Sequence, residues 1–430
     1  MRTAQTRREF LKASGSSVAA LYVLGLAGCG GDGGSSSGVV EVFNDKPGAW
    51  SKSYAEMGKL SKKQIGIGMK GVPFQDPTAF QQAIQQSLRA GGEDTPDLFT
   101  WWSGYRLDDL ARAGGLEDIS SIWDSQTQKG NLSENLALAF TFDGKQYAVP
   151  GHVSYYPVFY NKKVFEEQGL QPPETWDELM SMADALKQAG VTPFYATIDG
   201  RWPSLIWFEE LMIRSDPDFY DRLMQGEESY TDPFVVNVFE EWRSMIEADY
   251  FSTLDIPMDS TAVGMVSKGE IAMMPIGTWF NAQFIAGGMK PVEDYGTFVL
   301  PNLNPDLEEN VIVVETGALG IPTNAADTEA SMQVAEWWVS PKAATAWAEH
   351  LGDIPINPTA DASNPLLGEL VSTVQDGDYR FMQRYWEATP PEIVENAVEE
   401  LVRFMLHPEE LMDVLQTIQT LAENEWNKRG

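Results

Sequence analysis

The chain has 430 residues, of which 43% are hydrophobic, and 30 basic against 63 acidic residues give a formal net charge of −33. Such an acidic surface repels nucleic acid and argues against it as a partner, whereas it does not affect the binding of a neutral ligand. We therefore attribute the acidity to the habitat of the protein and not to its function. A single cysteine excludes an internal disulfide and a cysteine-based metal site. The chain is longer than the length that one hydrophobic core usually organises, so we predict two lobes.

The N-terminal segment has the pattern of an export signal. Two adjacent arginines precede a short apolar stretch (18–27), and small residues then lead to Cys29. An uncleaved membrane helix is the alternative, but this stretch is far shorter than the roughly 20 residues that span a bilayer. The pattern resembles twin-arginine lipoprotein signals, so we expect 1–28 to be removed and Cys29 to carry lipid. Residues 29–38, rich in Gly and Ser, predict a flexible tether.

Beyond the tether, short β-rich runs alternate with amphipathic helical stretches. This alternation predicts an α/β fold with parallel sheets, helices on both faces and a ligand at the carboxyl ends of strands. Thr175 is a plausible N-cap and Gly190 a stop for one of the helices. The expected strands are 39–43 and 96–100, and the expected helices are 50–60, 77–90, 107–113, 176–189, 328–339, 341–349 and 393–406.

Several short motifs are rejected as functional sites. The glycines of 66–71 match a dinucleotide fingerprint, but a proline follows at once and no helix opens there. The segment 34–38 matches a nucleophile elbow, yet it lies in the tether. The histidines at 152, 350 and 407 are too scattered in sequence to predict a metal cluster. We therefore expect no metal and no cofactor.

Fourteen tryptophans give the most useful signal. A sugar packs its C–H face on Trp or Tyr rings and offers hydroxyls to carboxylates, amides and cations. Tryptophans in helical apolar patterns are expected in the core, whereas those in turn-like segments rich in Gly, Pro, Ser or Asn are expected in a cleft. The expected core residues are Trp207, Trp242, Trp337 and Trp338; the expected cleft residues are Trp101, Trp102, Trp202 and Trp279, with Tyr155 nearby and Lys46, Asp76, Asn281 and Glu315 as polar partners.

Three segments, 143–150, 158–166 and 173–179, and a second block at 268–274 with Gly277 and Trp279 resemble the signature of family 1 extracellular solute-binding proteins. The segments 96–99 and 320–322 are weaker matches. These are the sugar-capturing lipoproteins of ABC importers, in the class of maltose-binding protein. The resemblance implies a two-lobed periplasmic-binding-protein-like fold with three interlobe crossovers and a hinged cleft. The implied crossovers lie near 148–151, 300–304 and 351–355, with one lobe made of 39–149 and 303–352 and the other of 150–302 and 353–430.

The resemblance also implies a ligand site. Lys46, Trp101, Tyr155 and Trp279 match positions that commonly touch sugar, and Trp386 matches an aromatic platform of the last segment. Gly104 and Tyr105, however, stand where a maltose-type binder has charged sugar-contacting residues.

The implied function is capture of a carbohydrate without catalysis, followed by delivery to the permease subunits of an ABC importer. We expect a monomer anchored to the outer face of the cytoplasmic membrane through Cys29. Two alternatives stay open: the same fold binding a polyol or peptide, and a secreted glycoside hydrolase with two carboxyl groups at a set separation.

Overall fold

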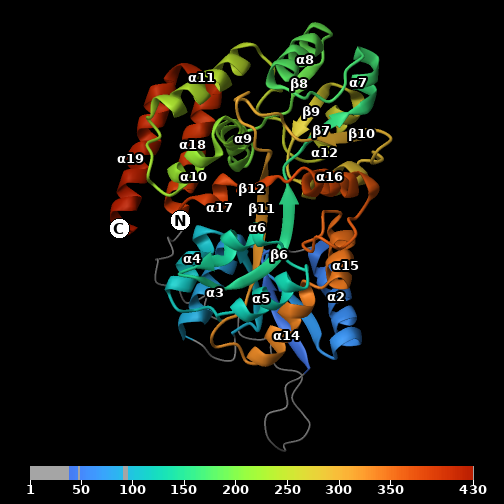
Figure 1. Cartoon of the computed structure of the whole chain (residues 1–430), viewed down its shortest axis with the longest axis vertical. Helices are drawn as coiled ribbons and strands as arrows, with labels where there is room; N and C mark the ends of the chain where they lie inside the picture. The colour runs from blue at the N-terminus through green and yellow to red at the C-terminus, as the bar shows by residue number, and fades with distance from the viewer. Residues whose placement is uncertain (1–37, 47–48, 91–94, 430) are drawn as a thin grey trace, which may run out of the picture. The chain divides into compact units, whose positions relative to one another are not determined.

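The computed structural model describes residues 38–46, 49–90 and 95–429 (Figure 1). The body forms one compact unit from Gly38 to the C-terminus. The expected signal, Cys29 and almost all of the tether lie outside the described residues. Among the residues described, no helix combines the length and the apolar character needed to cross a membrane.

One lobe is built on a mixed six-stranded sheet in the order β12-β11-β3-β1-β2, with β6 also paired to β11. β1, β2 and β3 are parallel, whereas β11 runs antiparallel to β3 and to β6. Figure 1 shows β6 and β11 running up from this lobe towards the other. The strands are β1 Val39–Asn44, β2 Gly68–Pro73, β3 Leu98–Trp102, β6 Ala148–Tyr155, β11 Val311–Gly320 and β12 Arg380–Gln383, and a separate hairpin pairs β4 Thr141–Phe142 with β5 Lys145–Gln146.

Helices surround this sheet because each has one apolar face to bury. α2, α14 and α15 pack against one another (Figure 1). The helices of this part are α2 Ala49–Ile65, α3 Pro77–Ala90, α4 Tyr105–Arg112, α5 Ser120–Gln128, α6 Glu134–Ala137, η1 Leu138–Phe140, α14 Thr328–Trp338 and α15 Pro341–Leu351.

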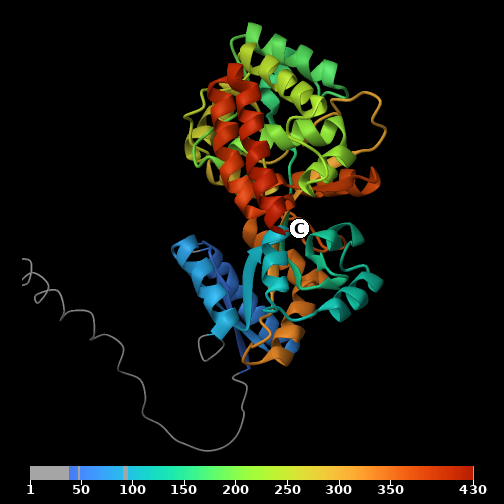
Figure 2. The same cartoon turned by 90° about the vertical axis from the view of Figure 1, so that its left-hand side faces the viewer.

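The other lobe holds a four-stranded sheet in the order β10-β7-β9-β8, and its helices α18 and α19 lie side by side in both views (Figure 1, Figure 2). Its strands are β7 Val158–Asn161, β8 Thr192–Phe194, β9 Ile271–Pro275 and β10 Tyr295–Phe298. Its helices are α7 Lys162–Gln168, α8 Trp176–Gln188, η2 Trp202–Ser204, α9 Leu205–Ser215, α10 Pro217–Met224, α11 Pro233–Glu247, α12 Ser260–Lys268, η3 Thr278–Phe280, α13 Asn281–Ala286, α16 Pro365–Asp376, α17 Tyr385–Ala388, α18 Pro391–Leu406, η4 Pro408–Glu410 and α19 Leu411–Arg429.

Local sequence rules explain many of these boundaries. Thr175 and Glu178 form a reciprocal capping box at the start of α8, with Glu178 N donating to the Thr175 hydroxyl and Thr175 N donating to the Glu178 carboxylate. Asp216 and Asp232 cap α10 and α11, each followed by a proline that needs no hydrogen-bond acceptor. The N-cap expected at Thr175 is confirmed.

The expected α/β class is correct, but the expectation of parallel sheets is wrong, since both sheets are mixed. The strand expected at 96–100 is shifted to Leu98–Trp102, so that Trp101 and Trp102 lie in the strand and not after it. The four tryptophans expected in the core, Trp207, Trp242, Trp337 and Trp338, are all buried.

The chain leaves the six-stranded sheet after β6, which stays paired to β11 from Ala148 to Tyr155, and enters the four-stranded sheet with β7 at Val158. Figure 1 shows β6 itself running towards the other lobe, so the interlobe crossover expected near 148–151 stays a prediction. The second passage falls between β10 and β11, a span that includes 300–304. The lobe boundaries given above stay a prediction.

Asp353, which follows α15, links its segment of the chain to β6 by a hydrogen bond. Its Oδ2 accepts a 2.5 Å hydrogen bond from the Ser154 hydroxyl of β6, and its Oδ1 accepts from Ile354 N. Thr278 of η3 in turn accepts from Tyr155 N. Burial raises the pKa of Asp353 to about 6, although the bonds from Ser154 and Thr278 lower it.

This raised pKa predicts a pH-dependent contribution to stability. Below pH 3.8, the ordinary pKa of Asp, the carboxyl group is protonated in both the folded and unfolded chain. As the pH rises through about 6, the folded state must accept a buried charge, so stability is lost. Relative to Asp353→Asn, the wild type should lose on the order of 3 kcal/mol across this window. Urea unfolding of both proteins at several pH values measures it, and a difference that does not vary with pH contradicts the assignment.

Candidate functional site

The candidate site depends on which way the side chains of β11 point. Opposite residues of an antiparallel pair share a face, and successive residues alternate between faces. Glu315 is opposite Ser154, whereas Val314 is opposite Tyr155. Glu315 and Tyr155 therefore point to opposite faces of the sheet, although the sequence placed both in one cleft.

Glu315 belongs to a set of polar and aromatic side chains gathered around Arg384. Arg384 Nη1 donates to Glu315 Oε2 at 3.0 Å and to the Tyr156 hydroxyl at 2.9 Å, and its Nε and Nη2 bind both oxygens of Glu387 at 2.9 and 2.6 Å. Its guanidinium also lies over the Trp202 ring, 5.9 Å from the centroid. We call Tyr156, Trp202, Trp279, Glu315, Arg384 and Glu387 the Arg384 cluster.

Trp279 completes this cluster and joins the two lobes. It stands on η3, directly after β9 of the four-stranded sheet, and its ring lies 6.1 Å from that of Trp202. Its indole N–H donates to Glu315 Oε2, on the six-stranded sheet, at 3.1 Å. Both indole rings are partly exposed. Two of the predicted aromatic residues and one predicted carboxylate therefore meet.

The electrostatics keep Glu315 ionised. Burial by itself raises the pKa of this carboxyl, but Arg384, His152 and Tyr156 outweigh it and hold the pKa well below its ordinary value. Burial likewise raises the pKa of Glu387, with Arg384 acting in the opposite direction. A lowered pKa leaves Glu315 able to accept hydrogen bonds but unable to supply a proton at neutral pH.

A line of contacts extends the cluster to Lys46. His152 Nε2 lies 3.7 Å from Glu315 Oε1, and the His152 ring meets the Trp50 ring edge-on at 5.8 Å. Lys46 Nζ lies 5.9 Å from the centre of Trp50 and 3.4 Å from Asp45 Oδ2. Lys46 therefore lies at the periphery of the same group of side chains.

A second aromatic group forms around Arg106. Its guanidinium lies 5.4 Å from the Trp102 ring and 5.1 Å from the Trp386 ring, and its Nη2 pairs with Glu395 at 2.6 Å. Trp386 is two residues beyond Arg384. Trp102 and Trp386 thus come together as expected for a platform, and both remain partly exposed.

The other predicted site residues lie elsewhere and have structural partners. Asp76 is exposed and accepts from Ala79 N at the start of α3. Trp101 is buried beside Phe80 and donates to the Arg106 carbonyl. Tyr155 is buried against Phe381. Asn281 is fully buried and bonded to the Gly352 carbonyl and the Tyr295 hydroxyl.

Gly104 has a structural reason to differ from the charged residue of the maltose-type pattern. Its φ is +62°, and a Cβ there would lie 2.1 Å from the Glu387 carbonyl oxygen. No other residue fits between α4 and α17 without displacing the backbone.

Sequence reasoning missed His152, Arg384, Glu387 and Trp50, and of the adjacent rings Tyr155 and Tyr156 it kept only Tyr155 as a site residue. Tyr156 was detectable in principle, because strand alternation places it on the opposite face from Tyr155. Arg384 was not detectable, because an arginine followed three residues later by an acidic residue is usually a solvent-exposed ion pair on a helix. Only the pairing of β12 with β11 brings it to Glu315.

One group of described residues has the donor atoms for a metal ion. Ligand atoms of His407, Glu409 and Glu410 lie within 4.8 Å of one another at the turn between α18 and α19. Glu410 already pairs with Arg403, and His407 and Glu409 are exposed. The arrangement is an ordinary surface cluster and is not associated with either aromatic group.

Replacing Arg384 should be costly to the fold. Arg384→Met leaves Glu387 and Glu315, with side chains 1% and 17% exposed, without their cation. The free energy of unfolding should fall by about 3–5 kcal/mol. The matched control is Arg380→Met, which breaks ion pairs that are 30% exposed on the arginine side and should cost about 1 kcal/mol. Equal losses in denaturant unfolding would contradict a special role for Arg384.

Comparison with known proteins identifies the family. The family model of bacterial extracellular solute-binding proteins matches residues 71–345, which is more than half of the chain. An uncharacterised ABC transporter extracellular-binding protein of Pyrococcus horikoshii is 31% identical over 319 residues, covering 73% of this chain and 66% of that protein. A probable sugar-binding periplasmic protein of Brucella suis is 23% identical over 261 residues, covering 57% of this chain and 60% of that protein.

A solved structure shows the same fold. The bacterial solute receptor AcbH, described as having an exclusive preference for β-D-galactopyranose, superposes with a TM-score of 0.77 at 23% identity, covering 90% of this chain and 98% of that one. This chain spans slightly less than two thirds of the length of either curated relative. The two-lobed α/β architecture and the family match agree. The chain belongs to the bacterial extracellular solute-binding proteins.

Proposed function

We propose that this protein captures a mono- or oligosaccharide between its two lobes and delivers it to the permease of an ABC importer. The observation that carries the proposal is the Arg384 cluster, in which partly exposed indole rings stand beside an ionised carboxylate. Trp279 and Glu315 come from different sheets and meet at 3.1 Å. Stacking surfaces with charged hydrogen-bonding groups beside them suit a sugar ring, with its apolar face and hydroxyl edge.

The mechanism needs binding and domain closure only. A sugar stacked on Trp279 or Trp202 and bonded to Glu315 contacts both lobes, so it favours the conformation in which both contacts are made. The relatives named as sugar-binding support the choice of ligand class. We retain Lys46, Trp102, Trp202, Trp279, Glu315 and Trp386 as the proposed contacts, and we leave out Asp76, Trp101, Tyr155 and Asn281 because their side chains are engaged or buried elsewhere.

Hydrolysis does not fit this cluster. A glycosidase needs one carboxyl with a raised pKa to protonate the leaving group, beside a second carboxyl that stays ionised. The pKa of Glu315 is lowered, and Glu387 is fully buried with both oxygens bound to Arg384. We therefore propose a binding protein and not an enzyme.

The ligand class can be tested by thermal shift of residues 39–430 against mono-, di- and trisaccharides, polyols and short peptides, since a ligand that binds only the folded state raises Tm. We expect one group of sugars to raise Tm. Trp279→Ala should weaken that sugar by about 2 kcal/mol, roughly 30-fold in Kd. Trp426→Ala is the matched control, because this ring packs on Tyr105 outside the cluster. Shifts with polyols or peptides alone would overturn the sugar assignment, and turnover of an aryl glycoside would restore the hydrolase.

We also propose that Cys29 carries the lipid that holds this extracytoplasmic monomer at the outer face of the membrane. Exchange of Cys29 for serine removes the acceptor thiol, while attachment by more than one acyl chain is stable. In membrane fractionation, Cys29→Ser should move the protein from the membrane to the soluble fraction with its sugar-induced Tm shift intact. Continued membrane association of the variant would show that some other element anchors the protein.

A further inference from the structure

A cleft of about 750 Å³ opens on the face of β11 opposite the Arg384 cluster. Val314 and Thr316 line it, and these are the two residues that flank Glu315 and point the other way. None of the six residues of the Arg384 cluster contributes to its lining. We call it the Thr316 cleft. Its volume lies within the range of roughly 300–1,000 Å³ found for small-molecule sites.

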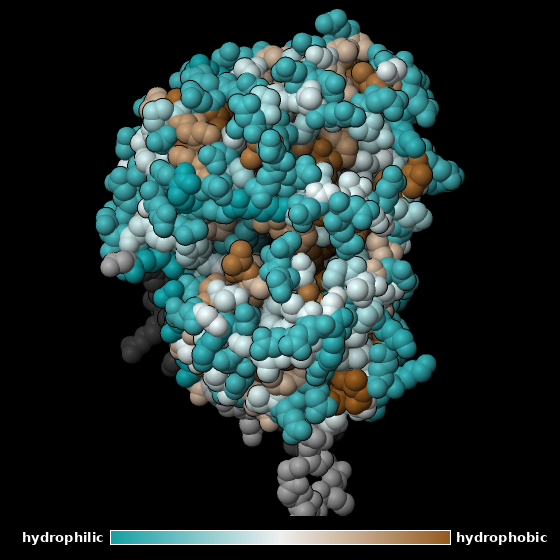
Figure 3. Space-filling model, in the orientation of Figure 1, coloured by the Kyte–Doolittle hydropathy of each residue, from teal (hydrophilic) through white to brown (hydrophobic). Residues whose placement is uncertain are grey.

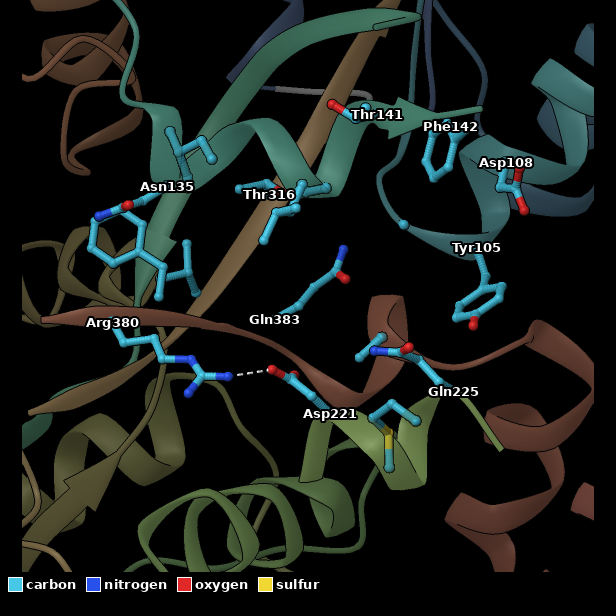
Figure 4. Close-up of a pocket in the computed structure, with 18 of the residues that line it drawn as sticks. Tyr105, Asp108, Asn135, Thr141, Phe142, Asp221, Gln225, Thr316, Arg380 and Gln383 are labelled. Atoms are coloured by element: carbon cyan, nitrogen blue, oxygen red, sulfur yellow. Dashed lines mark hydrogen bonds and ion pairs between the residues drawn. The ribbon is translucent and has the colours of Figure 1, made fainter. Parts of the chain in front are cut away.

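The Thr316 cleft receives side chains from both lobes. Figure 4 shows Tyr105 and Asp108 of α4 on one side and Arg380 and Asp221 on the other, with space between them. The surface in Figure 3 is hollowed where the two lobes meet. A ligand here would contact both lobes without touching the Arg384 cluster.

Aromatic rings form much of the lining. Tyr105, Phe142, Tyr379 and Phe381 all border the Thr316 cleft, and they come from α4, β4 and the start of β12. Phe142 is partly exposed and packs on Tyr147 at 6.5 Å. Aromatic faces attract a cation that lies about 6 Å or less from the ring centre.

The charge of the lining has the sign that a cation requires. Five carboxylates border the Thr316 cleft against two guanidinium groups, Arg112 and Arg380, so 5 − 2 leaves three negative charges. Both guanidiniums are paired: Arg112 binds Asp108 through two bonds of 2.9 and 2.8 Å, and Arg380 binds Asp218, Asp221 and Glu309 at 2.7, 2.6 and 3.2 Å. Asp143 and Asp378 are the carboxylates of the lining that lie outside these pairs. An anionic ligand would find no free basic group in this lining.

Gln383 supplies an unused hydrogen-bond donor at the centre. Its Nε2 is buried and lacks a hydrogen-bond partner among the described residues. In Figure 4 its side chain projects into the space between the two sides of the cleft. A buried donor without a partner is unfavourable, and a ligand carrying an acceptor oxygen would satisfy it.

We propose that the Thr316 cleft is a second ligand site, which binds a small organic ammonium ion that also carries a hydroxyl or carboxylate oxygen. The ammonium group lies against the aromatic rings and carboxylates, and the oxygen accepts from Gln383. The site is separate from the sugar-binding proposal, because no residue of one is a residue of the other.

Calorimetric titration of the folded protein with choline, glycine betaine and ethanolamine tests the proposal. At least one should bind with a Kd of about 1 mM or tighter. The neutral carbon analogue of choline, 3,3-dimethylbutanol, should bind at least tenfold more weakly because it lacks the charge. Failure of all three ammonium probes to bind, or equal binding of the neutral analogue, overturns the proposal.

Variants locate the binding. Phe142→Leu and Gln383→Leu should each weaken the ammonium probe at least fivefold and keep the sugar-induced Tm shift, which shows that they are folded. Asp378→Asn, on an exposed residue of the lining, provides a second charge test if either fails to fold. Trp279→Ala should give the reverse result, with sugar binding lost and the ammonium probe unaffected. Loss of ammonium binding in Trp279→Ala but not in Phe142→Leu would place the cation in the Arg384 cluster and refute the second site.

Discussion

The alternation of side chains along β11 is the constraint on which the rest of the structure depends. This strand pairs with β3, β6 and β12, and so it carries the end of the six-stranded sheet towards the second lobe. Consecutive residues must point to opposite faces. Glu315 therefore meets aromatic residues of one face while Thr316 bonds to Ser103 and lines the cleft on the other. A shift of register by one residue would exchange the two faces and destroy both arrangements.

The Arg384 cluster shows why a costly buried ion pair persists at such a position. Removing charges from water is unfavourable, and a well-packed apolar set would serve stability at least as well. Arg384 is held from one side by both oxygens of Glu387, which leaves one guanidinium nitrogen for Glu315 and Tyr156. The result is a carboxylate that is fixed, ionised and 17% exposed beside two indole rings. This arrangement is the one on which the proposed binding site rests.

Much of the fold could be predicted from sequence, because helix signals are local. Pro77–Ala90 and the capping box of α8 follow directly from residue order. Sheet direction could not be predicted in the same way, since antiparallel pairing of β11 joins residues far apart in the chain. Of the predicted site residues, Trp202, Trp279 and Glu315 do meet, while Asn281 looked like a loop amide and is a core residue bonded to Tyr295. Composition indicated which residue types could contact a sugar, but only the burial of each side chain separates the core residues from the accessible ones.

Gly104 shows how a close backbone contact can exclude a charged side chain at one position of a shared fold. The Glu387 carbonyl approaches Gly104 so closely that no side chain fits there, and the charged residue expected from the maltose-type pattern cannot be accommodated. The same short helix that imposes this contact, α17, presents Trp386 to Arg106 and holds Glu387 against Arg384. The charged groups beside the indole rings come instead from β11, through Glu315, and from Arg384, the residue between β12 and α17. A shared fold therefore does not fix the arrangement of charged groups around the aromatic rings, and the choice of ligand depends on the site and not on the fold.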